Sequence, residues 1–324
     1  MSKRTSGSAG RSTYSSTAWA TTFPACRFKG GTSLSKAFGL VPRFSEDIDI
    51  TVFRTDLGHA TSIEELEALS GKKRRASLDA IKAACQEFIN GPLRERLAAV
   101  LHDVLGSVRL SPDRYKLELD PHDPDQQTLL FWYPAATQNS IDYVRSAVKI
   151  EAGAKSALDP NVPATVKPYV ADDLGDIDLQ VAGITTVKAE RTFWDKVIIL
   201  HGVRSWHERR GELRHGGQRV SRHYYDVFRL LQSPIGTETR TDLRLALDCA
   251  RHARMFFNSP DLDLNHAMPG TFAIAPTQPM FDALRRDYAA MTGMVFGDVP
   301  PFDDVVAAVG EFEAHINVVP GSRD

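Results

Sequence analysis

Residues 28–50, "FKGGTSLSKAFGLVPRFSEDIDI", place two adjacent glycines, a Thr-Ser pair and two aspartates within one short segment. An apolar edge precedes the glycines, a helix-like stretch follows from Thr32, and Pro42 marks a turn. The stretch "DIDITVF" then alternates polar and apolar side chains, which is typical of a strand. The segment therefore predicts strand, turn, helix, turn and strand, in that order.

The second of these strands carries an unusual pair of charges. Side chains alternate between the faces of a strand, so Asp47 and Asp49 point the same way, about 6.6 Å apart, and Ile48 and Ile50 are expected to face the core. Carboxylates that close repel each other unless a cation lies between them. Their hard oxygen atoms suit Mg²⁺ or Mn²⁺, so the pair predicts a divalent metal site.

The glycine turn before this strand predicts a phosphate site. Gly30 and Gly31 let the backbone approach a ligand closely, and Thr32 and Ser33 open the following helix, whose unpaired N–H groups favour an anion. Either feature alone is weak, because most Gly-Gly pairs are plain turns and most isolated D-x-D strings are solvated. Their order and spacing together are more specific, and indicate a nucleoside triphosphate bound beside a metal ion.

Length and composition narrow the class of protein. A chain of 324 residues, 42% apolar and 25% charged, can bury a substantial core and is expected to form two domains. Three scattered cysteines without metal-ligand spacing predict free thiols in a reducing compartment. No apolar run approaches the roughly 18 residues of a membrane span, and the N-terminus lacks the apolar centre of a signal peptide, so we expect a cytoplasmic protein. A net charge of -2 means that RNA would need a local basic patch.

The chain divides into three parts. Residues 1–24 are rich in Ser, Thr and Gly and are expected to form a disordered tail. Residues 25–187 predict a mixed α/β domain, with a charged helical region over 63–105 that exposed "GKKRR" interrupts, and then three strands in "RYKLELD", "TLLFWYP" and "YVRSAVKIEAG". Residues 188–324 have mainly helical periodicity. The fold class is therefore α+β, a mixed-sheet domain followed by a mainly helical domain.

A lysine in the helical part stands beside an apolar stripe. On a helical wheel through "RTFWDKVIILH", Phe193, Val197 and Leu200 form the stripe, and Lys196 falls next to it. A lysine there is partly desolvated and needs an anion, although its stem could instead pack while its ammonium group reaches water.

The stretch "SRHYYDVFRLL" holds a carboxylate, Asp226, before a helical run that faces the core. An ordinary helix ion pair with Arg222 or Arg229 is a structural alternative to a functional role.

Segment 28–50 resembles the nucleotidyltransferase signature of the polymerase-beta-like superfamily, in which a Gly-Gly/Ser helix start is followed by D-x-D on the next strand. Within that superfamily it is similar to the AbiEii/AbiGii toxin family, which includes the MenT-type toxins of mycobacteria. The resemblance covers about residues 25–318 and continues in "VKIEAG", "KAERTFWDK", "RHYYD" and "RRDYAAMTGMVFGDVPPFDDVV".

The resemblance implies roles for three further residues. Glu151, which ends an apolar alternating strand, would be the third acidic residue that completes the metal site and assists the attacking hydroxyl; a simple rim carboxylate is the alternative. Lys196 would contact the nucleotide phosphates, with Arg191 and Thr192 as weaker candidates. Asp226 would be the last acidic motif residue, and either orients Lys196 or binds the sugar or base. The string "DIDLQV" at 176–181 lacks a glycine turn before it and predicts an ordinary strand.

The predicted function is a metal-dependent nucleotidyltransferase that releases pyrophosphate. The metal ligands would be Asp47, Asp49 and Glu151, and the NTP would lie against Gly30, Gly31, Thr32, Ser33 and Lys196. The resemblance further implies the toxin of a bacterial toxin–antitoxin or abortive-infection system, with members that extend tRNA at its 3′ end. RNA would then be the acceptor, and an antitoxin protein the partner.

Two other functions stay open from the sequence. The acceptor could be a small molecule or a protein hydroxyl, or the protein could be a catalytically silent nucleotide-binding sensor. The stretch over 201–223 holds six arginines and Trp206, and could either clamp an RNA backbone and stack a base or form a solvated loop.

Overall fold

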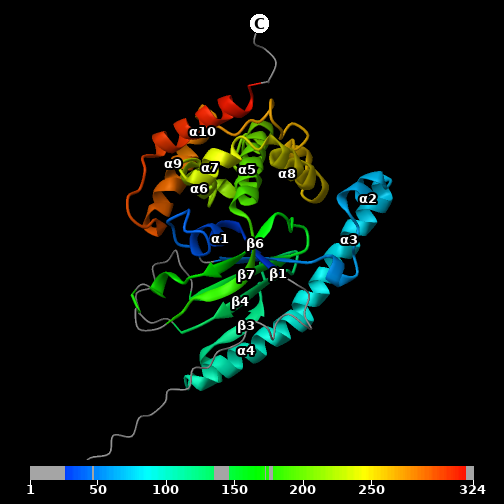
Figure 1. Cartoon of the computed structure of the whole chain (residues 1–324), viewed down its shortest axis with the longest axis vertical. Coiled ribbons are helices and arrows are strands. Elements are labelled where there is room, and N and C mark those ends of the chain that lie inside the picture. Colours follow the sequence, from blue (N-terminus) through cyan, green and yellow to red (C-terminus); the bar gives the residue numbers. More distant parts are fainter. Residues whose placement is uncertain (1–25, 46, 135–145, 172, 175–177, 319–324) are drawn as a thin grey trace, which may run out of the picture.

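The computed structural model of the chain describes residues 26–45, 47–134, 146–171, 173–174 and 178–318. A mixed sheet forms the lower half of the molecule and a group of helices forms the upper half, with α1 between them (Figure 1). This arrangement confirms the predicted α+β fold class. The predicted tail over 1–24 lies outside the described residues.

The sheet has seven strands within the described residues, in the order β3-β4-β5-β2-β1-β7-β6. Strands β2 and β5 run parallel, as do β1 and β7, and the other neighbours are antiparallel. The strands are β1 (Cys26–Lys29), β2 (Asp47–Val52), β3 (Lys116–Leu119), β4 (Thr128–Trp132), β5 (Ala147–Gly153), β6 (Asn161–Val166) and β7 (Val181–Val187).

Segment 28–50 contains the predicted strand, helix and strand, which are β1, α1 (Gly30–Lys36) and β2. The helix begins earlier than predicted, so the predicted glycine turn is the first turn of α1. Strands β1 and β2 pair so that Lys29 lies opposite Asp49. Val52 is buried in the apolar cluster between the sheet and α3, and half-buried Ile50 packs against that cluster. Ile48, which was also expected to face the core, is half-buried and does not belong to the cluster. The sheet thus anchors β2 by one face and leaves its aspartates on the other.

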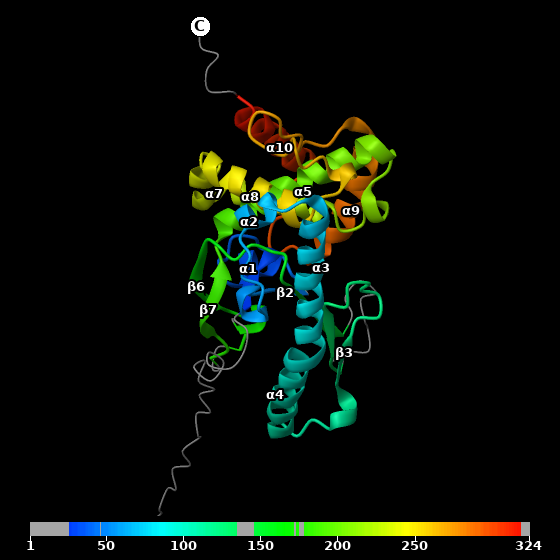
Figure 2. The same ribbon diagram turned by 90° about the vertical axis from the view of Figure 1, so that its right-hand side faces the viewer.

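The middle of the chain forms a long helical rod along one side of the sheet (Figure 2). It consists of α3 (Gly71–Phe88), a π-helical turn η3 (Ile89–Leu93) and α4 (Arg94–Ser107). The preceding helix α2 (Ile63–Ala68) lies beside the upper end of α3 and packs against α8. Helix α3 holds the rod against the sheet through buried Ile81, Cys85 and Phe88. The predicted interruption at "GKKRR" is wrong: these residues open α3, because lysine and arginine are good helix formers and their side chains reach water from a helix surface.

Within the part of the chain that the structure describes, six helices build the upper half, and all five predicted there are confirmed. They are α5 (Ala189–Arg210), α6 (Ser221–Leu231), α7 (Pro234–Thr239), α8 (Leu243–Phe256), α9 (Phe281–Met291) and α10 (Phe302–Ile316). Helix α5 runs through their centre with Phe193, Val197 and Leu200 fully buried. Leu34 of α1 joins the same core, so the glycine turn and the helical half are packed together.

Three elements escaped prediction: α7, β6 and most of β7. Strand β6 contains Pro163, which an edge strand tolerates because its outer side needs no ladder hydrogen bond. The strand predicted over 176–181 begins only at Val181; residues 178–180 are in no strand, and 176–177 lie outside the described residues. The last strand ends at Val187, where we predicted a domain boundary, and the independence of the two domains stays a prediction.

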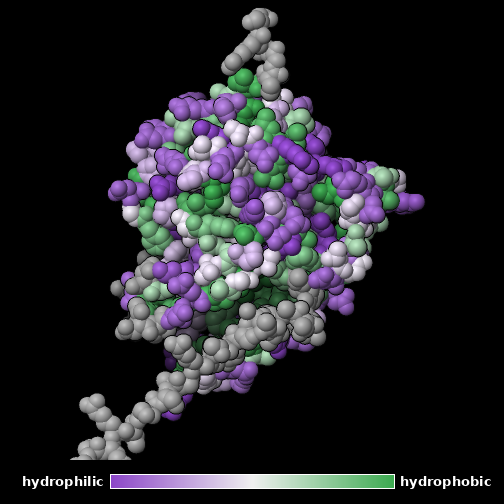
Figure 3. All heavy atoms as spheres, in the orientation of Figure 1, coloured by the Kyte–Doolittle hydropathy of each residue, from purple (hydrophilic) through white to green (hydrophobic). Residues whose placement is uncertain are grey.

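Short 3₁₀ turns connect these elements: η2 (Thr55–Leu57), η4 (Pro112–Arg114), η5 (Tyr169–Ala171), η6 (Arg214–Gly217), η7 (Pro260–Leu262), η8 (Gln278–Met280) and η9 (Thr292–Met294). The cysteines are free thiols, as predicted. Among the described helices, none has the length and apolar character needed to span a bilayer. On the face shown in Figure 3, mostly hydrophilic residues cover the helical half, and apolar residues gather lower down, over the sheet.

Candidate active site

A cavity of about 740 Å³ lies where the sheet meets the helical half, within the size range of small-molecule sites. Segments far apart in the sequence meet there, namely the β1–α1 turn, β2, β5 and α5. Most of the predicted site residues line it: Gly30, Gly31, Asp47, Asp49, Glu151 and Lys196.

The three predicted metal ligands come from two neighbouring parallel strands. Asp49 on β2 and Glu151 on β5 are direct register partners, and Asp47 lies two residues earlier on β2. Burial raises the pKa of the Asp49 carboxyl, and so does the charge of Glu151, although Lys29, Lys196 and Arg222 oppose the rise. This part of the cavity therefore concentrates negative charge in a partly desolvated place.

Two of these carboxylates, Asp47 and Glu151, lie close to basic side chains. Arg222 Nη1 lies 3.9 Å from Asp47 Oδ2, and Lys149 Nζ lies 2.5 Å from Glu151 Oε1. Within the described residues, which exclude Glu46, no three Asp, Glu, His or Cys side chains converge into a ready-made metal cluster. The donors nevertheless fit a hard divalent ion in type and charge, because such an ion would relieve the repulsion that raises the pKa of Asp49. It would compete with Arg222 and Lys149.

The two glycines are required by neighbouring side chains. Gly30 has a φ of +76°, which favours glycine, and a Cβ there would lie 2.8 Å from Asp49 Cγ. A Cβ on Gly31 would lie 2.7 Å from Arg43 Nη2. The turn therefore makes room for the side chains of the site, a reason that the sequence did not indicate.

Thr32 and Ser33 lie beneath the turn, and their side chains do not line the cavity. The Thr32 hydroxyl shares a 2.6 Å hydrogen bond with Ser45 Oγ and donates to the backbone carbonyl of Asp47. Ser33 Oγ donates to the carbonyl of Gly30 at 2.8 Å. These hydroxyls brace the turn against β2, so any phosphate contact from Thr32 or Ser33 must come from the backbone.

Lys196 is buried and ion-paired. It is 5% exposed, and its Nζ lies 2.7 Å from Asp226 Oδ2, so the alternative of an ammonium group in water is wrong. Asp226 is 0% exposed and pairs with Arg43, whose Nε and Nη2 donate to the two carboxylate oxygens at 2.7 and 2.8 Å. The alternatives of Arg222 and Arg229 as the partner of Asp226 are therefore wrong as well.

The charges of this buried triad depend on one another. Burial by itself would raise the pKa of Asp226, but Arg43 and Lys196 outweigh burial and hold that pKa below its usual value. Burial lowers the pKa of Lys196, and Asp226 compensates only in part. The triad fixes the Lys196 ammonium at the wall of the cavity.

Sequence reasoning missed Arg43, although it lies four residues before Asp47. Its partner Asp226 is 183 residues away, so no local periodicity marks it. Sequence reasoning also missed Asp195, which lines the cavity beside Lys196 and has a pKa raised by burial. Of the weaker phosphate candidates, Thr192 lines the cavity, whereas Arg191 is buried against Asp195 and Asp248.

The chain matches the family model described as "Nucleotidyl transferase AbiEii toxin, Type IV TA system" over residues 15–308. The chain belongs to the AbiEii family. It is therefore a nucleotidyltransferase and a toxin of a type IV toxin–antitoxin system, which confirms the family resemblance and the enzyme class. Among solved structures it is similar to MenT4, a nucleotidyltransferase toxin from Mycobacterium tuberculosis H37Rv, with 14% identity over 92% of this chain and 87% of that chain and a TM-score of 0.39. A comparison with curated proteins finds no match.

The arginine-rich stretch of this AbiEii protein is only partly a loop, because α5 continues to Arg210. Three of its arginines pair with carboxylates, at 2.6–3.6 Å: Arg204 with Glu208 and Glu313, Arg209 with Asp263, and Arg210 with Asp261. The other three line the cavity: Arg214, Arg219 and Arg222.

The aromatic residues of this region lie either on the cavity or in the core. Trp206 lines the cavity, and the guanidinium groups of Arg210 and Arg214 lie 5.6 and 5.4 Å from its ring centroid. Tyr224 and Tyr225 are 0% exposed and belong to the core, so they are not available to stack on a base.

Proposed function

We propose that this AbiEii-family protein transfers a nucleotide from an NTP to the 3′ end of an RNA, with tRNA as the preferred acceptor. The observation that carries the proposal is the meeting of Asp49, Glu151 and Lys196 on one cavity, since these residues come from two strands and a helix. A carboxylate pair facing a buried ammonium group is suited to a substrate that carries metal-bound phosphates.

In the proposed mechanism, Asp47, Asp49 and Glu151 hold Mg²⁺ or Mn²⁺, which when bound would offset phosphate charge and orient the NTP. The Lys196 ammonium, fixed by Asp226, contacts the phosphates and stabilises charge that develops during transfer. Glu151, at the half-exposed end of the carboxylate group, accepts the proton of the attacking hydroxyl. An O–P bond forms at the α-phosphorus, the bond to the β-phosphate breaks, and pyrophosphate leaves.

An RNA acceptor is supported by a cation and an aromatic ring that lie together on the same cavity. Arg214 can meet a phosphodiester backbone, and the Trp206 ring can stack on an unpaired base in place of a guanidinium group that now lies over it. The type IV toxin family supports a cognate antitoxin protein as partner. We also propose that the protein acts in the cytoplasm.

The direct test uses purified protein, Mg²⁺, each labelled NTP in turn and total tRNA. We expect label in RNA and equimolar pyrophosphate, and a loss of at least about 100-fold for Asp49→Asn, since a metal contributes several kcal/mol. Asp298→Asn, a change of the same kind at an exposed position, should match wild type. Label that survives ribonuclease would refute the RNA acceptor, and unchanged activity of Asp49→Asn would refute the metal assignment.

A further inference from the structure

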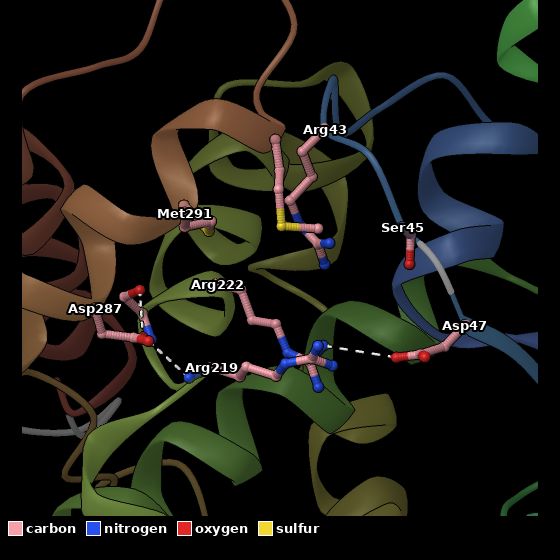
Figure 4. Close-up of a pocket in the computed structure, with 9 residues that line it drawn as sticks. Arg43, Ser45, Asp47, Arg219, Arg222, Asp287 and Met291 are labelled. Carbon is pink, nitrogen blue, oxygen red and sulfur yellow. Dashed lines mark hydrogen bonds and ion pairs between the residues drawn. The ribbon is translucent and has the colours of Figure 1, made fainter. Parts of the chain in front are cut away.

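One carboxylate outside the predicted site holds the turn that carries two of the cavity's arginines. Asp287 on α9 accepts three hydrogen bonds from Arg219, just before α6, and from Ser221, the first residue of α6 (Figure 4). Its Oδ1 accepts from the Arg219 backbone N–H at 2.6 Å, and its Oδ2 accepts from the backbone N–H and the hydroxyl of Ser221 at 2.7 and 2.6 Å. Hydrogen bonds to an ionised carboxylate are among the strong ones, so this contact fixes the turn.

The turn needs such an anchor. Arg219 has a φ of +59°, an uncommon value for a residue with a side chain, and Ser221 is 0% exposed. Arg222 follows directly in the first turn of α6, so the direction in which α6 begins decides where Arg222 points. A carboxylate from α9, more than sixty residues later in the chain, thereby determines the geometry of the cavity wall.

The anchored arginines face the centre of the site. Arg222 points across the cavity toward Asp47, and Arg219 lies beside it in the same view. Both arginines also line a water-sized cavity of about 20 Å³ that reaches Asp47 and Arg43. The positive charge of Arg222 lowers the pKa of both Asp49 and Lys196. A guanidinium group has five N–H donors in a planar fork, which suits phosphate oxygens.

We propose that Asp287 is a positioning residue for the triphosphate: it sets the Arg219–Arg222 turn so that both guanidinium groups meet phosphate oxygens above Asp47. This inference rests on the proposed function, because it assigns part of the same substrate site. Asp287 itself hydrogen-bonds to the turn and is not among the residues that line the 740 Å³ cavity.

The test is a double-mutant cycle on the full chain, with Mg²⁺-tripolyphosphate as the probe and calorimetric Kd as the readout. Asp287→Asn removes one acceptor oxygen and the charge, and should weaken binding about tenfold, as should Arg222→Gln. Because Asp287 acts through Arg222 as well as Arg219, the loss in the double variant should fall clearly short of the hundredfold expected for independent effects; a full hundredfold, additive loss overturns the proposal. Asp282→Asn, an exposed position on the same helix, should bind like wild type.

Amide hydrogen exchange tests the anchoring without any ligand. The amides of Arg219 and Ser221 should exchange faster in Asp287→Asn than in wild type or Asp282→Asn, and unchanged rates overturn the proposal. If Asp287→Asn does not fold, Ser221→Ala removes one of the three hydrogen bonds and should weaken binding about threefold.

The remaining outcomes separate this inference from the proposed function. Wild-type protein that transfers nucleotides, yet gives the same Kd as Asp287→Asn, refutes the positioning role alone. Wild-type protein that shows the expected order of Kd values but transfers no nucleotide refutes the proposed function and supports the positioning role.

Discussion

Replacement of Gly30 by alanine should show how far activity depends on the position of Asp49, when it is compared with a second glycine variant of similar backbone strain. Gly30 and Gly39 both have positive φ angles, +76° and +64°, so alanine at either position costs about 1–2 kcal/mol of backbone strain. A Cβ on Gly39 has nothing within 4 Å, whereas a Cβ on Gly30 would lie 2.8 Å from Asp49 Cγ. The two variants therefore have similar backbone strain, and they differ in whether the new methyl group contacts the side chain of Asp49.

The size of the effect follows from that contact. Carbon atoms pack at about 3.5–4.0 Å, so the Asp49 carboxylate must move by roughly 1 Å to accommodate the new methyl group. A displacement of that size at a reacting centre can cost about 100-fold in rate. We expect Gly30→Ala to lose at least that much kcat, and Gly39→Ala to stay within about twofold of wild type.

The assay is transfer of labelled nucleotide to RNA, with urea unfolding on the same samples. Gly39→Ala should lose about 1–2 kcal/mol of unfolding free energy from strain alone, and Gly30→Ala should lose at least as much, because its clash with Asp49 adds to the strain. Equal activities of the two variants would refute the reasoning, because Asp49 would then tolerate the displacement or have no part in the reaction.

Three further predictions concern buried charges and RNA. Asp226→Asn leaves two buried cations without a counter-charge and should lower the unfolding free energy by about 3–5 kcal/mol at pH 7. The pKa of Asp226 in the folded protein lies below its unfolded value near 3.9, so urea titrations should show this loss down to about pH 4 and a smaller loss only below that pH. Burial lowers the pKa of His252 to about 3, so between pH 6.5 and pH 5 only the unfolded state takes up a proton at this residue. The unfolding free energy of wild type should therefore fall by about 2 kcal/mol between pH 7 and pH 5, and His252→Phe should not show this fall. Trp206→Ala should weaken RNA binding about tenfold in a filter assay, whereas Lys73→Ala, on α3 and outside the cavity wall, should leave it within about twofold.

Part of the site could be predicted from the sequence because it depends on local geometry. Alternation along a strand places Asp47 and Asp49 on one side, and helical periodicity places Lys196 next to the buried stripe. These relations extend over two to four residues, and backbone dihedral angles set them wherever the element lies. The same reasoning found β1, α1, β2 and the five main helices of the second half.

Other parts depend on which elements meet in space. The parallel register of β2 and β5 brings Glu151 opposite Asp49, and the segment between α1 and β2 brings Arg43 to Asp226 on α6. Strand β6 escaped prediction because its place at the edge of the sheet is what permits Pro163.

The sequence by itself thus determined most of the local elements, the position of Asp47 and Asp49 on one side of β2, and the family to which the chain belongs. Only the tertiary structure decided the partners of Lys196 and Asp226, the reason for Gly30 and Gly31, and the hydrogen bonds of Asp287. The physical reason is range: dihedral preferences act between near neighbours in the chain, whereas an ion pair or a steric contact depends on the final position of atoms that the sequence separates by up to 183 residues.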